Sequence, residues 1–117
     1  MKIYISGRIT GMPIEEAQQS FAAMEAILIK AGATVVNPVT LTHDHDKTWI
    51  SYMRECIIAL MACEAVVMLD TWSLSKGACV EFNLAFDLGM KIYNERGKPM
   101  HLALIESANL KNNLFDN

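Results

Sequence analysis

Short apolar runs typical of buried strands alternate along this chain with longer segments of helical periodicity. The expected strands are residues 2–6, 34–38, 65–69, 91–93 and 101–105. Between them, apolar side chains recur at helical spacing over 13–31, 48–61 and 76–88. A strand, a crossover helix and a second strand form a right-handed parallel unit. The alternation therefore predicts an α/β fold with three layers, doubly wound around a mostly parallel five-stranded sheet.

Such a fold is of the flavodoxin or Rossmann type, and we expect the whole chain, 1–117, to form one domain. Apolar residues make up 52% of the sequence, which is enough for a core on both faces of a sheet. The net charge of −3 gives no reason to expect binding to nucleic acid or to a membrane. A small anionic ligand remains compatible with this charge, because local amides can hold it.

The three cysteines, Cys56, Cys63 and Cys79, are an odd number without the spacing of a metal site. Each lies among apolar residues, which is typical of reduced core cysteines. No apolar run approaches the length of a membrane span, and no leader pattern precedes the first strand. We therefore expect a cytoplasmic protein.

The stretch from Asp70 to Glu81 follows the third expected strand and opens a helix. Ser75 fits the N-cap position, and the free amides of Gly77 and Ala78 would favour an anion such as phosphate. Glu81 shares one helix face with Gly77, so a ligand could reach its carboxyl group. The alternative is a solvated glutamate without a function. Ligands of open α/β sheets bind at the carboxyl ends of the strands, where this stretch lies.

Two further segments attract attention. The loop Gly7–Pro13 follows the first strand, has two glycines, and presents Arg8 and Thr10; it is either a ligand loop or an ordinary turn. The segment His43–Asp46 contains two histidines and two aspartates, but adjacent residues rarely converge on one ion. We expect it to be a loop over the pocket, with neither a metal ion nor a cofactor in the protein.

Three pieces of the sequence resemble the superfamily of nucleoside 2-deoxyribosyltransferases and 2′-deoxynucleoside 5′-phosphate N-hydrolases. They are the strand and loop Tyr4–Gly11, the apolar strand Ala65–Leu69, and the segment Ser75–Glu81, which has the Ser-x-Gly-x-x-x-Glu spacing of that superfamily. Together with Trp72, the last segment resembles most closely a branch of short, mostly uncharacterised bacterial and phage domains.

The resemblance implies an enzyme that cleaves or transfers the N-glycosidic bond of a 2′-deoxynucleoside or its 5′-monophosphate. Glu81 would be the nucleophile, forming a covalent glycosyl intermediate, and its position near a helix N-terminus would keep it ionised. Tyr4 would orient Glu81, while Ser75 and the amides at Gly77 and Ala78 would hold the 5′ group. Gly7, Arg8 and Thr10 are our own candidates for phosphate or base contacts. A homo-oligomer, a dimer or a tetramer, is also implied.

One position departs from the superfamily, whose members usually carry an aspartate that assists the leaving base. Cys56 stands nearest to that position, and a thiol is a poor proton donor at neutral pH. Asp70 could substitute for it, or be only a turn residue. Two alternatives therefore stay open: a nucleotide-binding module without catalysis, and a structural or interaction domain.

Overall fold

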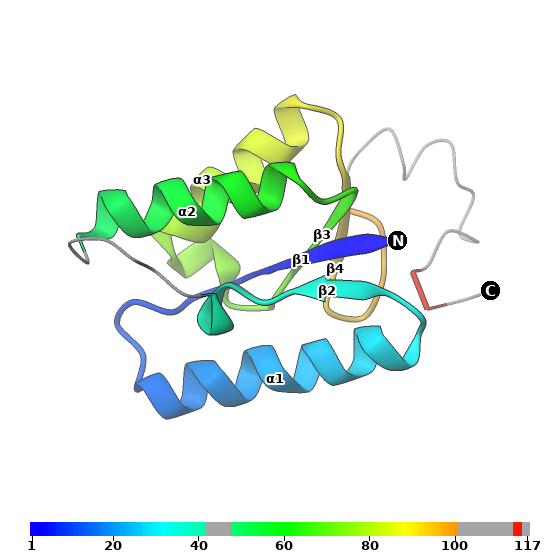
Figure 1. Ribbon diagram of the computed structural model, residues 1–117, viewed down its shortest axis with the longest axis horizontal. Coiled ribbons are helices and arrows are strands. Elements are labelled where there is room, and N and C mark those ends of the chain that lie inside the picture. Colours follow the sequence, from blue (N-terminus) through cyan, green and yellow to red (C-terminus); the bar gives the residue numbers. More distant parts are fainter. Residues whose placement is uncertain (42–47, 101–113, 116–117) are drawn as a thin grey trace.

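The computed structural model describes residues 1–41, 48–100 and 114–115, and places strands and helices in alternation (Figure 1). The strands are β1 (Lys2–Ser6), β2 (Thr34–Val36), β3 (Ala65–Met68) and β4 (Lys91–Asn94). The helices are α1 (Ile14–Lys30), α2 (Trp49–Met61) and α3 (Lys76–Asp87), with short 3₁₀ turns η1 (Pro38–Thr40) and η2 (Trp72–Leu74). The expected fifth strand, 101–105, and the segment 43–46 lie outside the described residues.

The described strands form one sheet in the order β2-β1-β3-β4, and every pair is parallel. The chain first moves from β1 to β2 at one edge, and then crosses back to β3 and β4 on the other side. This reversal makes the carboxyl ends of β1 and β3 a topological switch point, where a crevice opens in folds of this kind. The predicted doubly wound α/β fold is confirmed.

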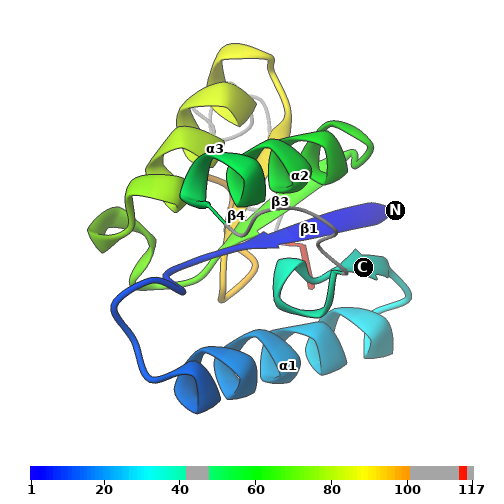
Figure 2. The same cartoon turned by 60° about the vertical axis from the view of Figure 1, so that its left-hand side comes forward.

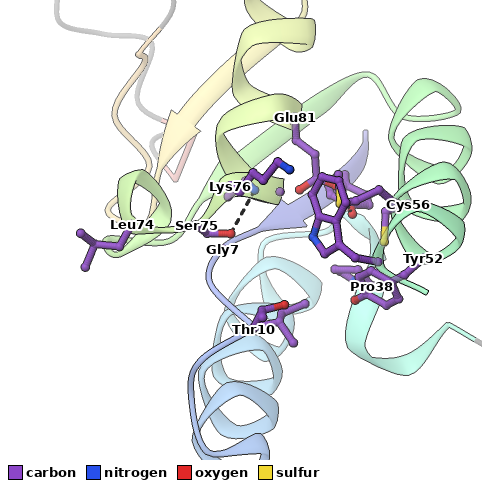
Figure 3. A pocket seen from close by; sticks show the side chains of 15 residues that line it. Gly7, Thr10, Pro38, Tyr52, Cys56, Leu74, Ser75, Lys76 and Glu81 are labelled. Atoms are coloured by element: carbon purple, nitrogen blue, oxygen red, sulfur yellow. Dashed lines mark hydrogen bonds between the residues drawn. The ribbon is translucent and has the colours of Figure 1, made fainter. Parts of the chain in front are cut away.

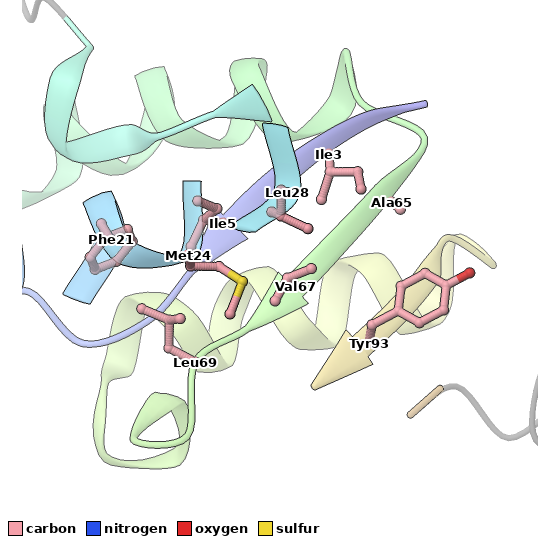
Figure 4. Packing of buried hydrophobic residues seen from close by; sticks show 9 residues of the cluster. All are labelled: Ile3, Ile5, Phe21, Met24, Leu28, Ala65, Val67, Leu69 and Tyr93. Carbon is pink, nitrogen blue, oxygen red and sulfur yellow. The ribbon is translucent and has the colours of Figure 1, made fainter. Parts of the chain in front are cut away.

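Helices cover both faces of the sheet, α1 on one side and α2 with α3 on the other (Figures 1 and 2). Along β1, Ile3 and Ile5 pack toward α1 in a cluster shown in Figure 4. Tyr4 packs on the opposite face, among residues of α2 and α3. Strand alternation therefore gives β1 an aliphatic side for the core and a polar side, with Tyr4 and Ser6, for the site.

Side chains and a glycine stand at several of the helix ends, and Ser75 is the N-cap that the sequence predicted. The Thr48 hydroxyl accepts the Ser51 amide at 3.1 Å at the start of α2, and the Ser75 hydroxyl accepts the Ala78 amide at 3.1 Å at the start of α3. Gly89 has a φ of 71° directly after the C-cap of α3, a conformation that glycine adopts without strain. Pro13, predicted inside α1, is instead its N-cap. None of the helices described is long and apolar enough to span a bilayer.

Candidate active site

Glu81 lies in the second turn of α3, and its carboxyl group meets the polar side of β1 (Figure 3). The Tyr4 hydroxyl donates to Glu81 Oε2 at 2.5 Å, and the Ser6 hydroxyl donates to Glu81 Oε1 at 2.7 Å. Only 4% of Glu81 is exposed. Each carboxyl oxygen therefore has one fixed donor, which sets the orientation of the group and leaves further lone pairs available.

Burial changes the acidity of this carboxyl group. Removal from water raises the pKa of Glu81 from its ordinary 4.5 to about 7, although the hydrogen bonds from Tyr4 and Ser6 lower it. The sequence predicted a carboxylate that the helix N-terminus keeps ionised, whereas in the structure desolvation outweighs the two hydrogen bonds and raises the pKa of Glu81. At neutral pH the protonated and ionised forms of Glu81 therefore coexist.

The two tyrosines near Glu81 stay protonated. Burial raises the pKa of Tyr4 far above its ordinary value, and the adjacent Glu81 raises it further. Burial also raises the pKa of Tyr52, on α2. Both phenols therefore remain hydrogen-bond donors over the whole physiological pH range.

A cavity of about 500 Å³ opens in front of Glu81, within the size range of small-molecule sites. It lies between the loop after β1, the first turns of α2 and the start of α3 (Figure 3). Most of its walls are apolar or aromatic. The lining residues are Tyr4, Gly7, Ile9, Thr10, Pro38, Trp49, Tyr52, Met53, Cys56, Leu74, Ser75, Lys76, Gly77, Ala78 and Glu81.

The structure thus brings together most of the residues that the sequence singled out. Tyr4, Gly7, Thr10, the helix start 75–78 and Glu81 all line this one cavity. Two of the glycines also have packing reasons. A Cβ at Gly7 would lie 2.8 Å from Leu69 Cδ1, and one at Gly77 would lie 2.9 Å from Met53 Sδ.

Arg8 and Asp70 do not join them. Both line a second cavity of about 350 Å³ beside α1. Arg8 Nη2 donates to the Gly11 carbonyl oxygen at 3.3 Å, and Asp70 forms an exposed ion pair with Arg96 at 3.1 Å. The Asp70 backbone amide donates to Glu95 Oε2 at 2.6 Å. The geometry therefore gives no support to Asp70 as a substitute for the missing aspartate, or to Arg8 as a contact in the cavity of Glu81.

Sequence reasoning missed Ser6 and the side of α2 that lines the cavity. Strand alternation, which puts Ser6 on the same face as Tyr4, was the signal for Ser6. The helical spacing of apolar side chains over 48–61 is typical of a core face, but Trp49, Met53 and Cys56 of that segment line the cavity as well. Helical periodicity identifies a buried face without saying whether protein or a ligand covers it.

Cys56 lies on the wall of the cavity as a free, buried thiol. Burial raises its pKa to about 11, although the hydroxyls of Tyr4 and Tyr52 lower it. Among the described residues that line the cavity, Glu81 is the one carboxyl group. The described part of the chain also holds no cluster of three side chains suited to a metal ion.

Residues 1–94 match the family described as Domain of unknown function (DUF4406), which covers every element from β1 to β4. The chain belongs to this family. No curated protein sequence matches this DUF4406 chain significantly.

A solved structure extends the comparison. It comes from a characterisation of the 2-deoxyribosyltransferase of the psychrotolerant bacterium Bacillus psychrosaccharolyticus, and it superposes on this chain with a TM-score of 0.62. The match covers 92% of the DUF4406 chain and 82% of the other, at 16% sequence identity. At this identity the likeness shows a shared fold, the Rossmann-like fold that the sequence predicted.

Proposed function

We propose that this protein cleaves or transfers the N-glycosidic bond of a 2′-deoxynucleoside or its 5′-monophosphate, through a covalent glycosyl–Glu81 intermediate. One observation carries the proposal: a buried carboxyl group, held at both oxygens by Tyr4 and Ser6, faces a cavity of about 500 Å³. The fold shared with a 2-deoxyribosyltransferase supports the choice of reaction.

The chemistry follows from what a desolvated carboxylate can do. A Glu81 oxygen attacks the anomeric carbon C1′, the C1′–N bond breaks, and its electrons leave with the base. The transition state resembles an oxocarbenium ion, as in retaining glycosidases. Water or a second base then attacks C1′, and the carboxylate departs with the electrons of the ester bond. Tyr4 and Ser6 hold Glu81 in line for both steps.

The described cavity has no strong acid that could donate a proton to the leaving base. Retaining glycosidases use a second carboxyl group as the acid, and no other carboxyl lines the described cavity. The Cys56 thiol, with a pKa of about 11, is too weak an acid to donate efficiently. We therefore expect slow turnover, fastest with bases that leave easily.

A direct assay tests the proposal. The protein is incubated with the four 2′-deoxynucleosides and their 5′-monophosphates, with and without a free acceptor base, and chromatography measures released or exchanged base. The expected result is release by the wild type and none by Glu81→Ala. Mass spectrometry of quenched mixtures should find a deoxyribosyl adduct on the peptide that contains Glu81. Absence of release from every substrate, or equal release by Glu81→Ala, contradicts the proposal.

A second candidate is a nucleotide-binding module that has lost catalysis, favoured by Cys56 where the resembled superfamily usually has an aspartate. It keeps the cavity and predicts that nucleotides raise the melting temperature, because they bind only the native state. The same incubations would then release no base.

We also propose that the protein acts as a homo-oligomer, with the second copy on the outer face of α2. Ile50 and Ile58 of α2 are 59% and 68% exposed, and Val80 of α3 is 41% exposed, around an apolar groove next to the Glu81 cavity. Exposed apolar clusters of this kind mark protein contacts. Light scattering after gel filtration should give a multiple of 13.0 kDa, and Ile58→Lys should give the monomer.

A further inference from the structure

A lysine and a tryptophan meet across the cavity of Glu81. Lys76 is the first residue of α3, and Trp49 is the first residue of α2. The Lys76 ammonium lies 4.3 Å from the centroid of the Trp49 ring, which is a cation–π contact. Both side chains line the cavity, and 37% of Trp49 is exposed. The contact thus covers one aromatic face that a ligand could otherwise use.

Within the described residues, no carboxylate lies within salt-bridge distance of Lys76. Among these residues the indole face is the partner of its ammonium, and at an exposed site such a contact is weak. Lys76 can therefore leave Trp49 if a better partner arrives. A phosphate dianion is a better partner for an ammonium group than an indole ring is.

The position of Lys76 suits a phosphate on a substrate whose sugar reaches Glu81. Lys76 adjoins Ser75 at the start of α3, and Glu81 lies further along the same helix (Figure 3). Five residues of helix rise about 7.5 Å, comparable to the span of a deoxyribose 5′-phosphate from C1′ to phosphorus. The positive end of α3 adds to the attraction for an anion.

We propose that Lys76 and Trp49 select 5′-monophosphates over nucleosides by exchanging partners: the base stacks on the indole face that Lys76 vacates, and Lys76 pairs with the 5′-phosphate. The inference rests on the proposed function and names the substrate class of that same site. A nucleoside must displace Lys76 without offering it a phosphate. Lys76 therefore favours the monophosphate and disfavours the nucleoside.

The test is a binding comparison in the Glu81→Gln background, where turnover cannot interfere. Titration calorimetry measures Kd for each deoxynucleoside and its 5′-monophosphate, with and without Lys76→Gln. We expect the monophosphate to bind at least about 10-fold more tightly than the nucleoside when Lys76 is present. Lys76→Gln should weaken monophosphate binding by about that factor, and should leave nucleoside binding equal or tighter. A merely structural role would weaken both ligands together.

Lys91→Gln is the matched control. Lys91 is an exposed lysine at the amino end of β4, whereas the cavity of Glu81 lies at the carboxyl ends of the strands. It should leave the ratio of the two Kd values unchanged. In a Trp72→Phe background Trp49 is the one remaining tryptophan, so the fluorescence reports on Trp49 alone. Stacking of the base on the Trp49 ring should quench this fluorescence.

An unchanged Kd ratio in Lys76→Gln overturns the inference. Turnover by the wild type would then leave the proposed function standing. Conversely, selective binding that depends on Lys76, without turnover by the wild type, supports the inference and overturns the catalytic proposal. If neither ligand binds, both fall.

Discussion

The Tyr4 hydroxyl donates to Glu81 across 77 positions of sequence, and joins the central strand β1 to helix α3. The contact exists because β1 pairs with β3 in parallel, and α3, which follows β3, packs back over the face that carries Tyr4. Ser6 makes the second contact from the same strand. One strand therefore supplies both donors that hold the carboxyl group.

The raised pKa of Glu81 makes the stability of the fold depend on pH. A carboxyl whose pKa rises on folding, here from 4.5 to about 7, stabilises the protein fully below pH 4.5 and loses that contribution as the pH rises through 7. The loss is about 3 kcal/mol, because a difference of one pKa unit corresponds to about 1.36 kcal/mol. Urea unfolding of Glu81→Gln should show it as more stable than the wild type at pH 9 and nearly equal at pH 5. Parallel pH curves would contradict this prediction.

Activity should rise where stability falls. The proposed nucleophile is the ionised carboxylate, so kcat/KM for base release should increase with pH through about 7. Tyr4→Phe removes a donor that lowers this pKa and should move the rise to higher pH. Ser6→Ala removes the other donor and is its matched comparison. A profile that Tyr4→Phe leaves unmoved would show that the reaction does not depend on ionisation of Glu81.

Cys56→Asp should accelerate base release. The change puts a second carboxyl group on the wall of the cavity that Glu81 faces, as the resembled superfamily has it. General acid catalysis is typically worth 10²–10⁴-fold, and we expect a gain of at least about 10-fold in kcat. Cys56→Asn has similar shape without an acidic proton and should give no gain. Equal rates for the two variants would exclude a role for a proton donor at this position.

Asp70→Asn should leave base release within about 2-fold of the wild type, because Asp70 lies outside the cavity of Glu81. The ion pair of Asp70 with Arg96 is solvent-exposed, so its loss should cost less than about 1 kcal/mol. Assay and melting temperature can be measured on one preparation. A large fall in activity with unchanged stability would show that Asp70 takes part in the reaction, and would contradict this prediction.

Gly7→Ala should destabilise the fold by about 1–3 kcal/mol, because the new methyl group would lie 2.8 Å from Leu69 Cδ1. The cost should shrink in a Leu69→Ala background, where that atom is gone. A double-mutant cycle from urea unfolding measures the coupling. If the two changes are simply additive, the close approach of Gly7 and Leu69 is not the reason for a glycine at this position.

The fold could be predicted from the sequence because the signals for its strands and helices are local. The strand at 2–6 and the cap at Ser75 each depend on neighbouring residues, and the structure has both. The contact of Tyr4 and Glu81 came from the resemblance, since no local pattern joins residues so far apart.

The remaining features depend on three-dimensional packing. Arg8 and Asp70 line a different cavity from Glu81. Their direction depends on the side of the sheet to which the loops after β1 and β3 turn. The acidity of Glu81 depends on burial, which periodicity does not measure. The contact between Lys76 and Trp49 depends on where two helices begin in space.

The alternation along β1 links the orientation of the Glu81 carboxyl group to the packing of the core. Tyr4 and Ser6 face the site only while Ile3 and Ile5 face α1. A slip of one residue in this strand would bury hydroxyls in the core and turn isoleucines toward Glu81. A misaligned molecule would thus lose both donors to Glu81, so recovery of the proposed base release during refolding would report native strand pairing directly.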